Sequence, residues 1–394
     1  MKEIKEIDLE RAVQINNGLS DTSADGAQLV FDKKYGIMFC AYMPGTQGSY
    51  GESRGRISLS YFPATQPTNI RFVTVVEEKD VYCQNAFGLG DGKVRILYEK
   101  NSRAEGDHLT CFKDFDFKTE TFSAEKTVKV KLEDGSVTDL CTSVQFSYLE
   151  DHGFFNHRLI STEQVNVGCC TFSSASDAGL NGSSGEESDE CFEENVVFGA
   201  ITSGFAEPIL YRSYDNLETL EFFAIYPNPA NYEFDYKFLD GVIYGICRTE
   251  SEIDCEQTSR SYDVGKTWTE PRPIIGSIPC RPRLIIYGGN VLYACNMFDM
   301  NTGNRPEIPQ GRTHIRLHLG KNENPNENVV IADLHRKYGM VNMCIYDLMG
   351  DLYLAYSTSE AALEYQNGNP KVRGKDAIRY IKLGDLLPKF CEAR

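Results

Sequence analysis

The sequence contains no apolar run long enough to cross a membrane, and its N-terminus, MKEIKEIDLERAVQI, lacks the apolar core of a secretion signal. Basic residues are in deficit. The 40 Lys and Arg against 57 Asp and Glu give a formal net charge of -17, which argues against nucleic acid or an anionic membrane as partner. The 13 cysteines are scattered without CxxC spacing, so we expect reduced thiols and no disulfide framework. These absences predict a soluble, cytoplasmic protein.

Tryptophan and histidine are also scarce, with one Trp and six His in 394 residues. The shortage of Trp disfavours a lectin, because sugar platforms often use that side chain, although the 22 Tyr could take its place. Gly, Tyr and Phe are abundant, at 33, 22 and 22 residues, and this mixture suits many short strands joined by tight turns. We therefore expect an all-β fold.

A β-hairpin pattern recurs along the chain: an apolar run, a glycine turn and an alternating strand. The turns fall 56, 61, 88, 48 and 61 residues apart, at Gly36, Gly92, Gly153, Gly241, Gly289 and Gly350. A hairpin repeated at about this period is typical of a β-propeller. We predict one propeller domain over residues 1–394 with six blades. A seventh could lie in the 88-residue interval, which holds VVFGAITSG, PILYRSY and LEFFAIYP. A segment such as Arg11–Asn17 would complete the last blade.

Residues 173–195, SSASDAGLNGSSGEESDECFEEN, interrupt this pattern. Their Ser, Gly, Asp and Glu content predicts an exposed acidic insertion. A calcium loop formed by Glu186, Glu187, Asp189 and Glu190 is conceivable, but the spacing matches no known loop, so we favour a solvated loop.

One local motif indicates the class of propeller. Ser261–Trp268, SYDVGKTW, fits the pattern S-x-D-x-G-x-T-W. In such a turn the Asp carboxylate can cap backbone N–H groups, the Gly permits a positive φ and the Trp packs beneath. The segment resembles the Asp-box of sialidase-like propellers. Because that motif is structural, the resemblance implies a sialidase-like fold with one Asp-box and leaves the chemistry open.

The stretch Tyr232–Arg248, YEFDYKFLDGVIYGICR, reads as two strands around an Asp240-Gly241 turn. Tyr232 lies 8 residues before Asp240 and Arg248 lies 8 residues after it. We therefore predict that the phenol and the guanidinium face each other at the open end of the hairpin. The open ends of other hairpins should meet at the same face, which makes their polar residues candidate ligand-binding groups. Each could instead be an ordinary strand-end residue facing water.

Residues 230–300 as a whole resemble the sialidase superfamily. In exo-sialidases a Glu stands about 16 residues before this central Arg and activates a Tyr nucleophile, while three Arg bind the sialic acid carboxylate. Here that position holds Tyr232, and Glu233 is one register away. A Tyr at that position instead resembles the propeller-fold polysaccharide lyases, such as rhamnosyl-glucuronate and ulvan lyases. The resemblance implies β-elimination next to a uronic acid, with Tyr232 as base and Arg248 favouring the ionised Tyr or binding the uronate carboxylate.

This scheme also needs a histidine at the same rim, and it needs no metal or cofactor. His157 follows the third hairpin turn, and the alternation of GRTHIRLHL puts Arg312 and His314 on one face. Arg54 follows the first hairpin, where sialidase-like enzymes often carry a substrate Arg. We predict catalytic roles for Tyr232, Arg248 and His157, and substrate-binding roles for Arg54, Glu99, Arg281, Asn296, Arg312 and His314.

The prediction is an enzyme that cleaves a glycosidic bond at an acidic sugar of an oligosaccharide or polysaccharide, by β-elimination. A glycoside hydrolase of the same fold, exo-sialidase or rhamnosidase-like, is the second interpretation. A non-catalytic glycan-binding propeller is the third.

Overall fold

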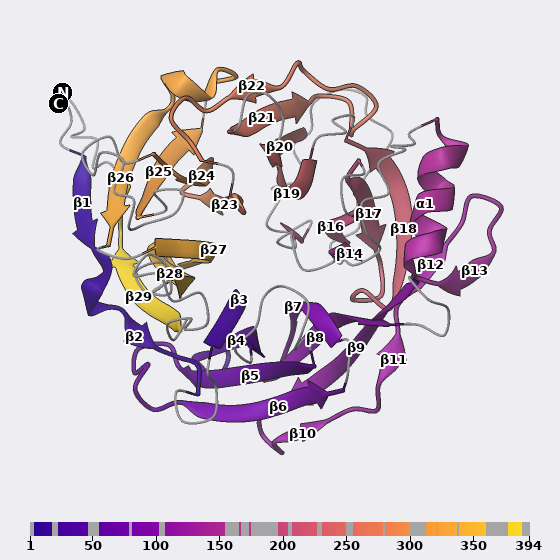
Figure 1. Ribbon diagram of the computed structural model, residues 1–394, viewed down its shortest axis with the longest axis horizontal. Coiled ribbons are helices and arrows are strands. Elements are labelled where there is room, and N and C mark those ends of the chain that lie inside the picture. The colour runs from indigo at the N-terminus through magenta and orange to yellow at the C-terminus, as the bar shows by residue number, and fades with distance from the viewer. Residues whose placement is uncertain are drawn as a thin grey trace, which may run out of the picture.

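Six mostly antiparallel sheets stand around a central axis as the blades of a β-propeller (Figure 1). The computed structural model describes residues 4–17, 23–45, 55–78, 81–101, 107–153, 165–166, 173–174, 196–203, 207–226, 231–249, 255–278, 280–298, 313–320, 322–336, 339–359 and 377–387. In each blade the strands follow one another outward from the axis in chain order, except that the outermost strands of blades 3, 5 and 6 come from earlier in the chain (Figure 1). The predicted all-β fold with six blades is confirmed.

Blades 1, 2 and 4 are built from consecutive strands. From the axis outward, blade 1 contains β3 (Ser23–Asp32), β4 (Ile37–Gly45), β5 (Arg56–Pro63) and β6 (Arg71–Glu77). Blade 2 contains β7 (Val81–Gly90), β8 (Lys93–Asn101) and β9 (His108–Asp116), and both β10 (Thr121–Phe122) and β11 (Lys126–Thr127) pair with β9. Blade 4 contains β19 (Asn231–Leu239), β20 (Val242–Thr249), β21 (Glu256–Ser261) and β22 (Arg272–Pro273).

Blades 5 and 6 each receive their outermost strand from the N-terminus. Blade 5 consists of β23 (Arg283–Tyr287), β24 (Asn290–Asn296), β25 (His314–Gly320), β26 (Val329–His335) and β1 (Lys5–Asp8), which pairs with β26 in parallel. Blade 6 consists of β27 (Gly339–Leu348), β28 (Asp351–Ser359), β29 (Ile378–Gly384) and β2 (Val13–Gln14). The short 3₁₀ helices η1 (Leu9–Arg11) and η4 (Pro325–Glu327) connect strands. The prediction that Arg11–Asn17 completes the last blade is confirmed by β2.

Blade 3 departs from the predicted hairpin repeat. Its strands are β14 (Val165–Asn166) and β15 (Ser173–Ser174), which both pair with β16 (Val197–Ser203), followed by β17 (Ile209–Ser213), β18 (Thr219–Ile225), β12 (Lys129–Lys131) and β13 (Val137–Asp139). The runs that could have formed a seventh blade are thus β16, β17 and β18 of this blade. Of the predicted 173–195 insertion, residues 173–174 form β15 and residues 175–195 lie outside the described residues.

The third predicted hairpin, around Gly153, is wrong. Thr142–Asp151 forms the helix α1, and Gly153, with a φ of 77°, follows the C-cap residue His152. Glycine is favoured after a helix C-cap for the same reason that it is favoured in hairpin turns, because it adopts positive φ without steric cost. The glycine signal therefore marks a helix end at this position. No described helix is long and apolar enough to cross a membrane.

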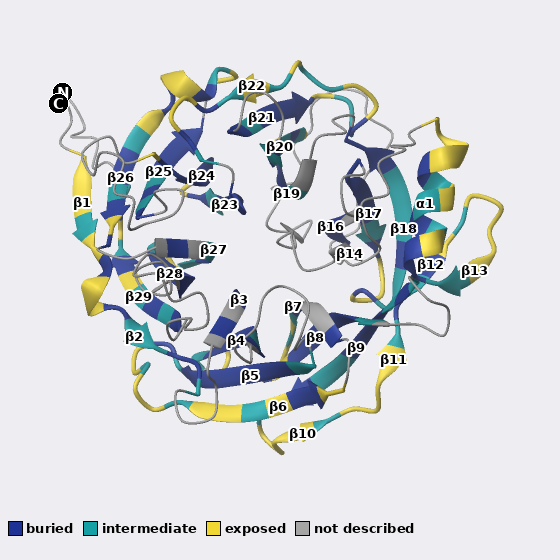
Figure 2. Cartoon of the chain, in the orientation of Figure 1, coloured by how far each residue is buried: buried dark blue, intermediate teal, exposed yellow. Residues whose placement is uncertain are grey.

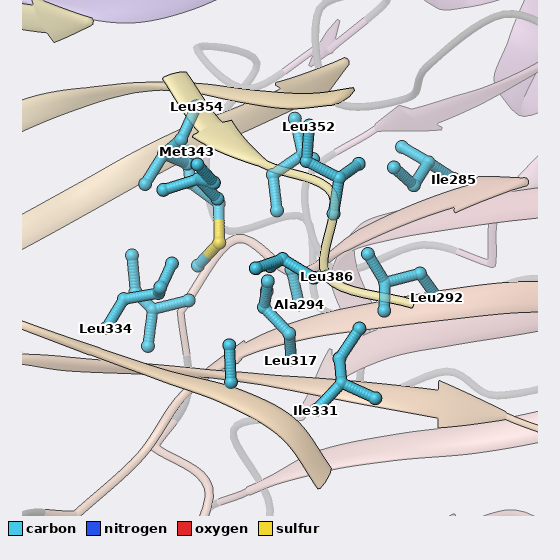
Figure 3. Close-up of a cluster of buried hydrophobic side chains, with 14 of the residues drawn as sticks. Ile285, Leu292, Ala294, Leu317, Ile331, Leu334, Met343, Leu352, Leu354 and Leu386 are labelled. Carbon is cyan, nitrogen blue, oxygen red and sulfur yellow. The ribbon is translucent and has the colours of Figure 1, made fainter. Parts of the chain in front are cut away.

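Apolar side chains fill the space between neighbouring blades. Between blades 5 and 6, for example, Leu292, Ala294 and Leu317 pack against Leu352 and Leu354 (Figure 3). Fully burying one such leucine contributes about 1.5–3 kcal/mol relative to an exposed one. Figure 2 shows that exposed residues gather on outer strands such as β1 and β6 and in the peripheral turns. Packing between blades, and not within any one sheet, thus fixes where the inner strands lie.

Side chains also bond to the axial edge of the innermost strands. Asp235 Oδ2 on β19 accepts a hydrogen bond from Leu284 N on β23 (2.9 Å), and Arg283 Nε on β23 donates to Met343 O on β27 (2.9 Å). Bonds of the same kind join Asn296 Nδ2 to Met340 O (3.1 Å), Gly26 N to Ser357 Oγ (3.2 Å) and Leu29 N to Cys344 Sγ (3.3 Å). Because an inner strand has no neighbouring strand on that edge, these bonds satisfy its buried backbone groups and join blade to blade.

The turn at Ser261–Trp268 has the geometry that the sequence predicted. Asp263 Oδ1 accepts from Thr267 N (2.8 Å), Ser261 Oγ accepts from Gly265 N (2.7 Å), and Gly265 has a φ of 85°. The Trp268 ring packs against the apolar cluster between blades 3 and 4. This turn joins the third and fourth strands of blade 4.

Blade 3 carries a second turn with the same hydrogen bonds, which the sequence motif did not reveal. Asp215 Oδ1 accepts from Thr219 N (2.8 Å), and Ser213 Oγ accepts from Leu217 N (2.9 Å). The position of the motif's glycine is occupied by Leu217 at a φ of 69°, and Asn216 precedes it at 57°. The carboxylate and hydroxyl bonds therefore hold the turn even where a leucine must take a positive φ.

Candidate functional site

The hairpin of β19 and β20 places a glutamate, and not a tyrosine, opposite Arg248. Its two-residue turn is Asp240-Gly241, with φ values of 50° and 76°, so Leu239 pairs with Val242. Facing residues are therefore equidistant from the midpoint of the turn, and this register pairs Glu233 with Arg248. The prediction that Tyr232 faces Arg248 is wrong, because it counted from Asp240 itself.

Tyr232 lies at an irregularity of the ladder. The register shifts between Asn231, which pairs with Thr249, and Glu233, so Tyr232 has no direct partner on β20. An extra residue of this kind is a β-bulge, which bends the strand and is common at the rims of sheets. The structure describes the backbone of Tyr232 and not its side chain.

Glu233 and Arg248 form an ion pair at the open end of this hairpin. Arg248 Nη1 donates to Glu233 Oε2 at 2.9 Å, and the two side chains are 15% and 13% exposed. Such low exposure means that water screens the attraction between the two charges weakly. On the next strand outward, Glu256 lies directly opposite Arg248 and is fully buried. One sheet face thus presents the row Glu233, Arg248 and Glu256.

Blade 5 supplies further cations at the equivalent end of its inner hairpin. Arg281 precedes β23 and is 8% exposed, and Arg283 at the start of β23 is fully buried. Both guanidinium groups lower the pKa of the Cys344 thiol on β27, against burial, which is the larger effect and raises it. Asn296 ends β24, and its amide donates to Met340 O, so its described role is to join blade 5 to blade 6.

Glu99 lies in blade 2 at the position that corresponds to Arg248 in blade 4, and His314 lies on the third strand of blade 5. Glu99, near the end of β8 in blade 2, is fully buried and accepts from Thr110 Oγ1 at 3.0 Å within its own blade. His314 begins the third strand of blade 5, and its Nε2 lies 3.2 Å from Asp333 Oδ1. Burial alone would raise the pKa of Asp333, but His314 and Arg316 lower it to about 2. The alternation predicted for this strand is seen in the shared contact of His314 and Arg316 with that carboxylate.

Three predicted residues, His157, Arg54 and Arg312, lie outside the described residues. Within the described ranges, no group of three or more His, Cys, Asp and Glu side chains is placed to hold a metal ion. Among the cysteines whose side chains the structure describes, all eight are buried and none forms a disulfide.

Two acidic residues of the row, Glu233 and Glu256, were missed as site residues by sequence reasoning. Glu233 would have been found by centring the Asp-Gly turn on its midpoint, as a two-residue hairpin loop requires. Glu256 is harder to predict from the sequence, because the length of the loop between β20 and β21 does not determine which residues of the two strands pair.

Comparisons with known proteins identify the fold. The sequence matches no protein-family model and no curated protein. A sialidase from Trypanosoma rangeli in complex with sialic acid is similar in structure, with a TM-score of 0.54, 10% identity, and coverage of 96% of this chain and 60% of that one. A Dyadobacter fermentans protein of unknown function has a TM-score of 0.61 and 12% identity, over 96% of this chain and 99% of its own. A Hadza microbial sialidase has a TM-score of 0.56 and 11% identity, over 94% and 68% of the two chains.

These similarities show a sialidase-like propeller fold. The chain spans about three fifths of the length of the Trypanosoma sialidase. At such low identity the likeness establishes the arrangement of the blades and leaves the chemistry to be argued from the site.

Proposed function

We propose that this propeller is a glycoside hydrolase that acts on a sugar bearing a carboxylate. The observation that carries the proposal is the nearly buried ion pair of Glu233 and Arg248 at the inner hairpin of blade 4. Its supports are the sialidase-like fold and Arg281 at the same end of blade 5. Small-ligand sites commonly use a small number of precisely placed polar or charged groups to orient the ligand.

In this proposal Arg248 recognises the sugar carboxylate, because a guanidinium presents its N–H donors in a planar fork that matches the two oxygens of a carboxylate. Glu233 is the acid–base group. Hydrolysis adds one water across the glycosidic C–O bond. Glu233 accepts a proton from the attacking oxygen and returns it to the oxygen of the leaving sugar, so no proton is gained or lost overall.

β-Elimination, the mechanism preferred from the sequence, loses its main support with the corrected register. It required the Tyr232 phenol beside Arg248, and the facing residue is Glu233. The two mechanisms give different products: hydrolysis releases a saturated sugar, whereas elimination creates a C4–C5 double bond that absorbs in the ultraviolet.

The test is a screen of aryl glycosides of sialic, glucuronic and galacturonic acids, together with uronate oligosaccharides, followed by absorbance and by mass spectrometry of the products. We expect products whose summed mass exceeds that of the substrate by one water. Elimination products would sum to the mass of the substrate. Glu233→Gln should lower kcat/KM at least about a hundredfold. A matched control is Glu120→Gln, which removes an exposed carboxylate bonded to Arg71 at the edge of blade 2 and should leave turnover unchanged.

Two results would refute the proposal. A new ultraviolet chromophore with no water added would establish a lyase. Binding of anionic sugars without turnover, unaffected by Glu233→Gln, would indicate a glycan-binding propeller.

A further inference from the structure

One buried carboxyl group in blade 3 has no charged partner among the described residues. Glu207 precedes Pro208 and the first residue of β17, and it is only 5% exposed. Its Oε2 is shielded from solvent and has no hydrogen-bond partner in the described part of the chain. Burial raises the pKa of this carboxyl, and only a hydrogen bond from its own backbone N–H opposes that effect. The protonated, neutral form is therefore the one that suits this position.

The elements packed around Glu207 do not compensate a negative charge there. Ile209, two residues further along, pairs with Ile225 on β18 and packs with Leu149 on α1. The titratable and charged side chains on these elements are Tyr148, Glu150, Asp151, Tyr211, Arg212, Glu221 and Tyr226. None of them shifts the pKa of Glu207, and Arg212 is bonded to Glu221. Loss of the proton would leave a buried carboxylate without a cation, which is strongly disfavoured.

A backbone hydrogen bond connects this position to Tyr226, which follows β18. Pro208 O accepts from Tyr226 N at 2.9 Å. Tyr226 is 1% exposed, and its ring belongs to the apolar cluster between blades 3 and 4. Its centroid lies 4.6 Å from that of the Phe234 ring, and its Oη lies 3.7 Å from Cys247 Sγ. Tyr226 thus joins the end of blade 3 that carries Glu207 to the inner hairpin of blade 4.

The residues that Tyr226 contacts are next to the candidate site. Phe234 pairs with Cys247 in the ladder of β19 and β20, and the next pair is Glu233 with Arg248. Successive side chains of a strand point to opposite faces of the sheet. Tyr226 therefore supports the hairpin on the face opposite the ion pair, at the backbone that carries both charged side chains.

We propose that Glu207 is a proton-operated switch that acts on the candidate site through Tyr226. While the carboxyl is protonated, Glu207 stays buried and Pro208 holds Tyr226 against the β19–β20 hairpin. When the proton is lost, the carboxylate moves toward water, the bond from Tyr226 N to Pro208 O weakens, and the hairpin loses its support. The effect on activity rests on the proposed function of this hairpin, whereas the effect on Tyr226 does not.

The direction of the change with pH follows from the burial. A carboxyl group whose pKa is raised in the folded state stabilises that state at low pH, and this stabilisation is lost as pH rises through the folded value. Order at Tyr226 should therefore decrease as the solution becomes less acidic. An ion-paired carboxylate gives the opposite sign. Glu221 on β18 is an example, because its bond from Lys131 lowers its pKa.

The test is amide hydrogen exchange of the full chain by NMR between about pH 5 and about pH 8, corrected for the pH dependence of exchange in unfolded peptides. In the wild-type protein the protection factor of the Tyr226 amide should fall at least about tenfold over this range, and those of Phe234 and Cys247 should fall with it. Glu207→Gln cannot ionise and should keep the protection seen at low pH. Glu221→Gln, a change on the strand that leads to Tyr226, is the matched control and should reproduce the wild-type fall.

The exchange data can overturn the proposal in two ways. If Glu207→Gln shows the same fall as the wild-type protein, Glu207 is not the switch. If the fall is confined to Tyr226 while Phe234 and Cys247 stay protected, the change does not reach the hairpin. Should Glu207→Gln not fold, Glu207→Met, which has a similar length and no charge, answers the same question.

The second readout is the pH profile of kcat/KM on the aryl glycoside identified in the screen. Glu207→Gln and the wild-type protein should be equally active at about pH 5, and the variant should be at least about threefold more active at about pH 8. Identical profiles would refute the coupling to the site. If the wild-type protein turns over no glycoside, the proposed function fails, while exchange at Tyr226 still decides whether Glu207 is a switch.

Discussion

A single hydroxyl group tests how strongly the blades are joined. Tyr236 on β19 is 1% exposed, and its Oη donates to Gly199 O in blade 3 at 2.7 Å, with Tyr211 O at 3.4 Å. Tyr236→Phe keeps the ring and its packing but leaves a buried carbonyl without this donor. One hydrogen bond contributes about 1 kcal/mol net, and an unsatisfied buried partner adds to the loss, so we expect a cost of about 1.5 kcal/mol.

The matching shift in melting temperature is small. With about 2.1 cal/mol/K of unfolding entropy per residue, a chain of 394 residues has about 0.8 kcal/mol/K, so 1.5 kcal/mol corresponds to about 2 °C. Urea unfolding followed by fluorescence gives the same difference in free energy more directly, provided that the two variants have equal m-values.

The control is Tyr380→Phe. Tyr380 is also 1% exposed, but its hydroxyl has no hydrogen-bond partner among the described residues. Removing that hydroxyl should leave stability unchanged or raise it, because a buried polar group without a partner is destabilising. Equal free energies of unfolding for the two variants would show that the Tyr236 bond does not stabilise the contact between blades 3 and 4.

Three further predictions concern the turns, the buried imidazole and the ion pair. Asp263→Ala and Asp215→Ala should each cost about 1–2 kcal/mol by urea unfolding, since each carboxylate holds a turn of the same geometry; a neutral Asp215→Ala would show that the blade 3 turn does not need it. Burial, and then the charge of Arg316, lower the pKa of His318 to about 4. As the pH drops from 6.5 to 4, the imidazole is therefore protonated in the unfolded chain but not in the folded one. The free energy of unfolding should fall by up to about 3 kcal/mol over this range. His318→Phe should remove that part of the pH dependence, and an identical pH profile would contradict the assignment. Arg248→Met should cost about 3 kcal/mol, because it leaves buried carboxylates without their cation, whereas Arg71→Met at the surface should cost less than about 1 kcal/mol.

The hairpin repeat could be predicted because two-residue and similar turns need a positive φ, which glycine adopts freely. Gly36, Gly92, Gly241, Gly289 and Gly350 all have a positive φ at a turn between the first two strands of a blade. The repeat failed only where the same conformation serves another purpose, at the end of α1. Local sequence gives the conformation of a glycine but not the element that precedes it.

The candidate site was harder to predict than the fold. Placing the centre of the turn one residue away puts Tyr232 opposite Arg248 in place of Glu233. The candidate acid–base group then changes from a carboxylate to a phenol. Long-range contacts were beyond prediction. Asn296, predicted to bind substrate, donates to the backbone of the next blade, and the buried Arg283 does the same. Which polar residues join blades and which face a ligand depends on neighbours that are distant in sequence.

The N-terminal segment pairs with two blades at the other end of the chain, β1 with β26 and β2 with β29. During synthesis, residues 5–14 leave the ribosome long before residues 329–335 and 378–384, and they can find their strand partners only after those residues have been made. Until then the outer edges of blades 5 and 6 lack these strands, and open strand edges are templates for pairing between chains. Ring closure is therefore expected to be the last step of folding and the step most exposed to aggregation. A chain without residues 1–14 should still form blades 1 to 4 and fail at the seam.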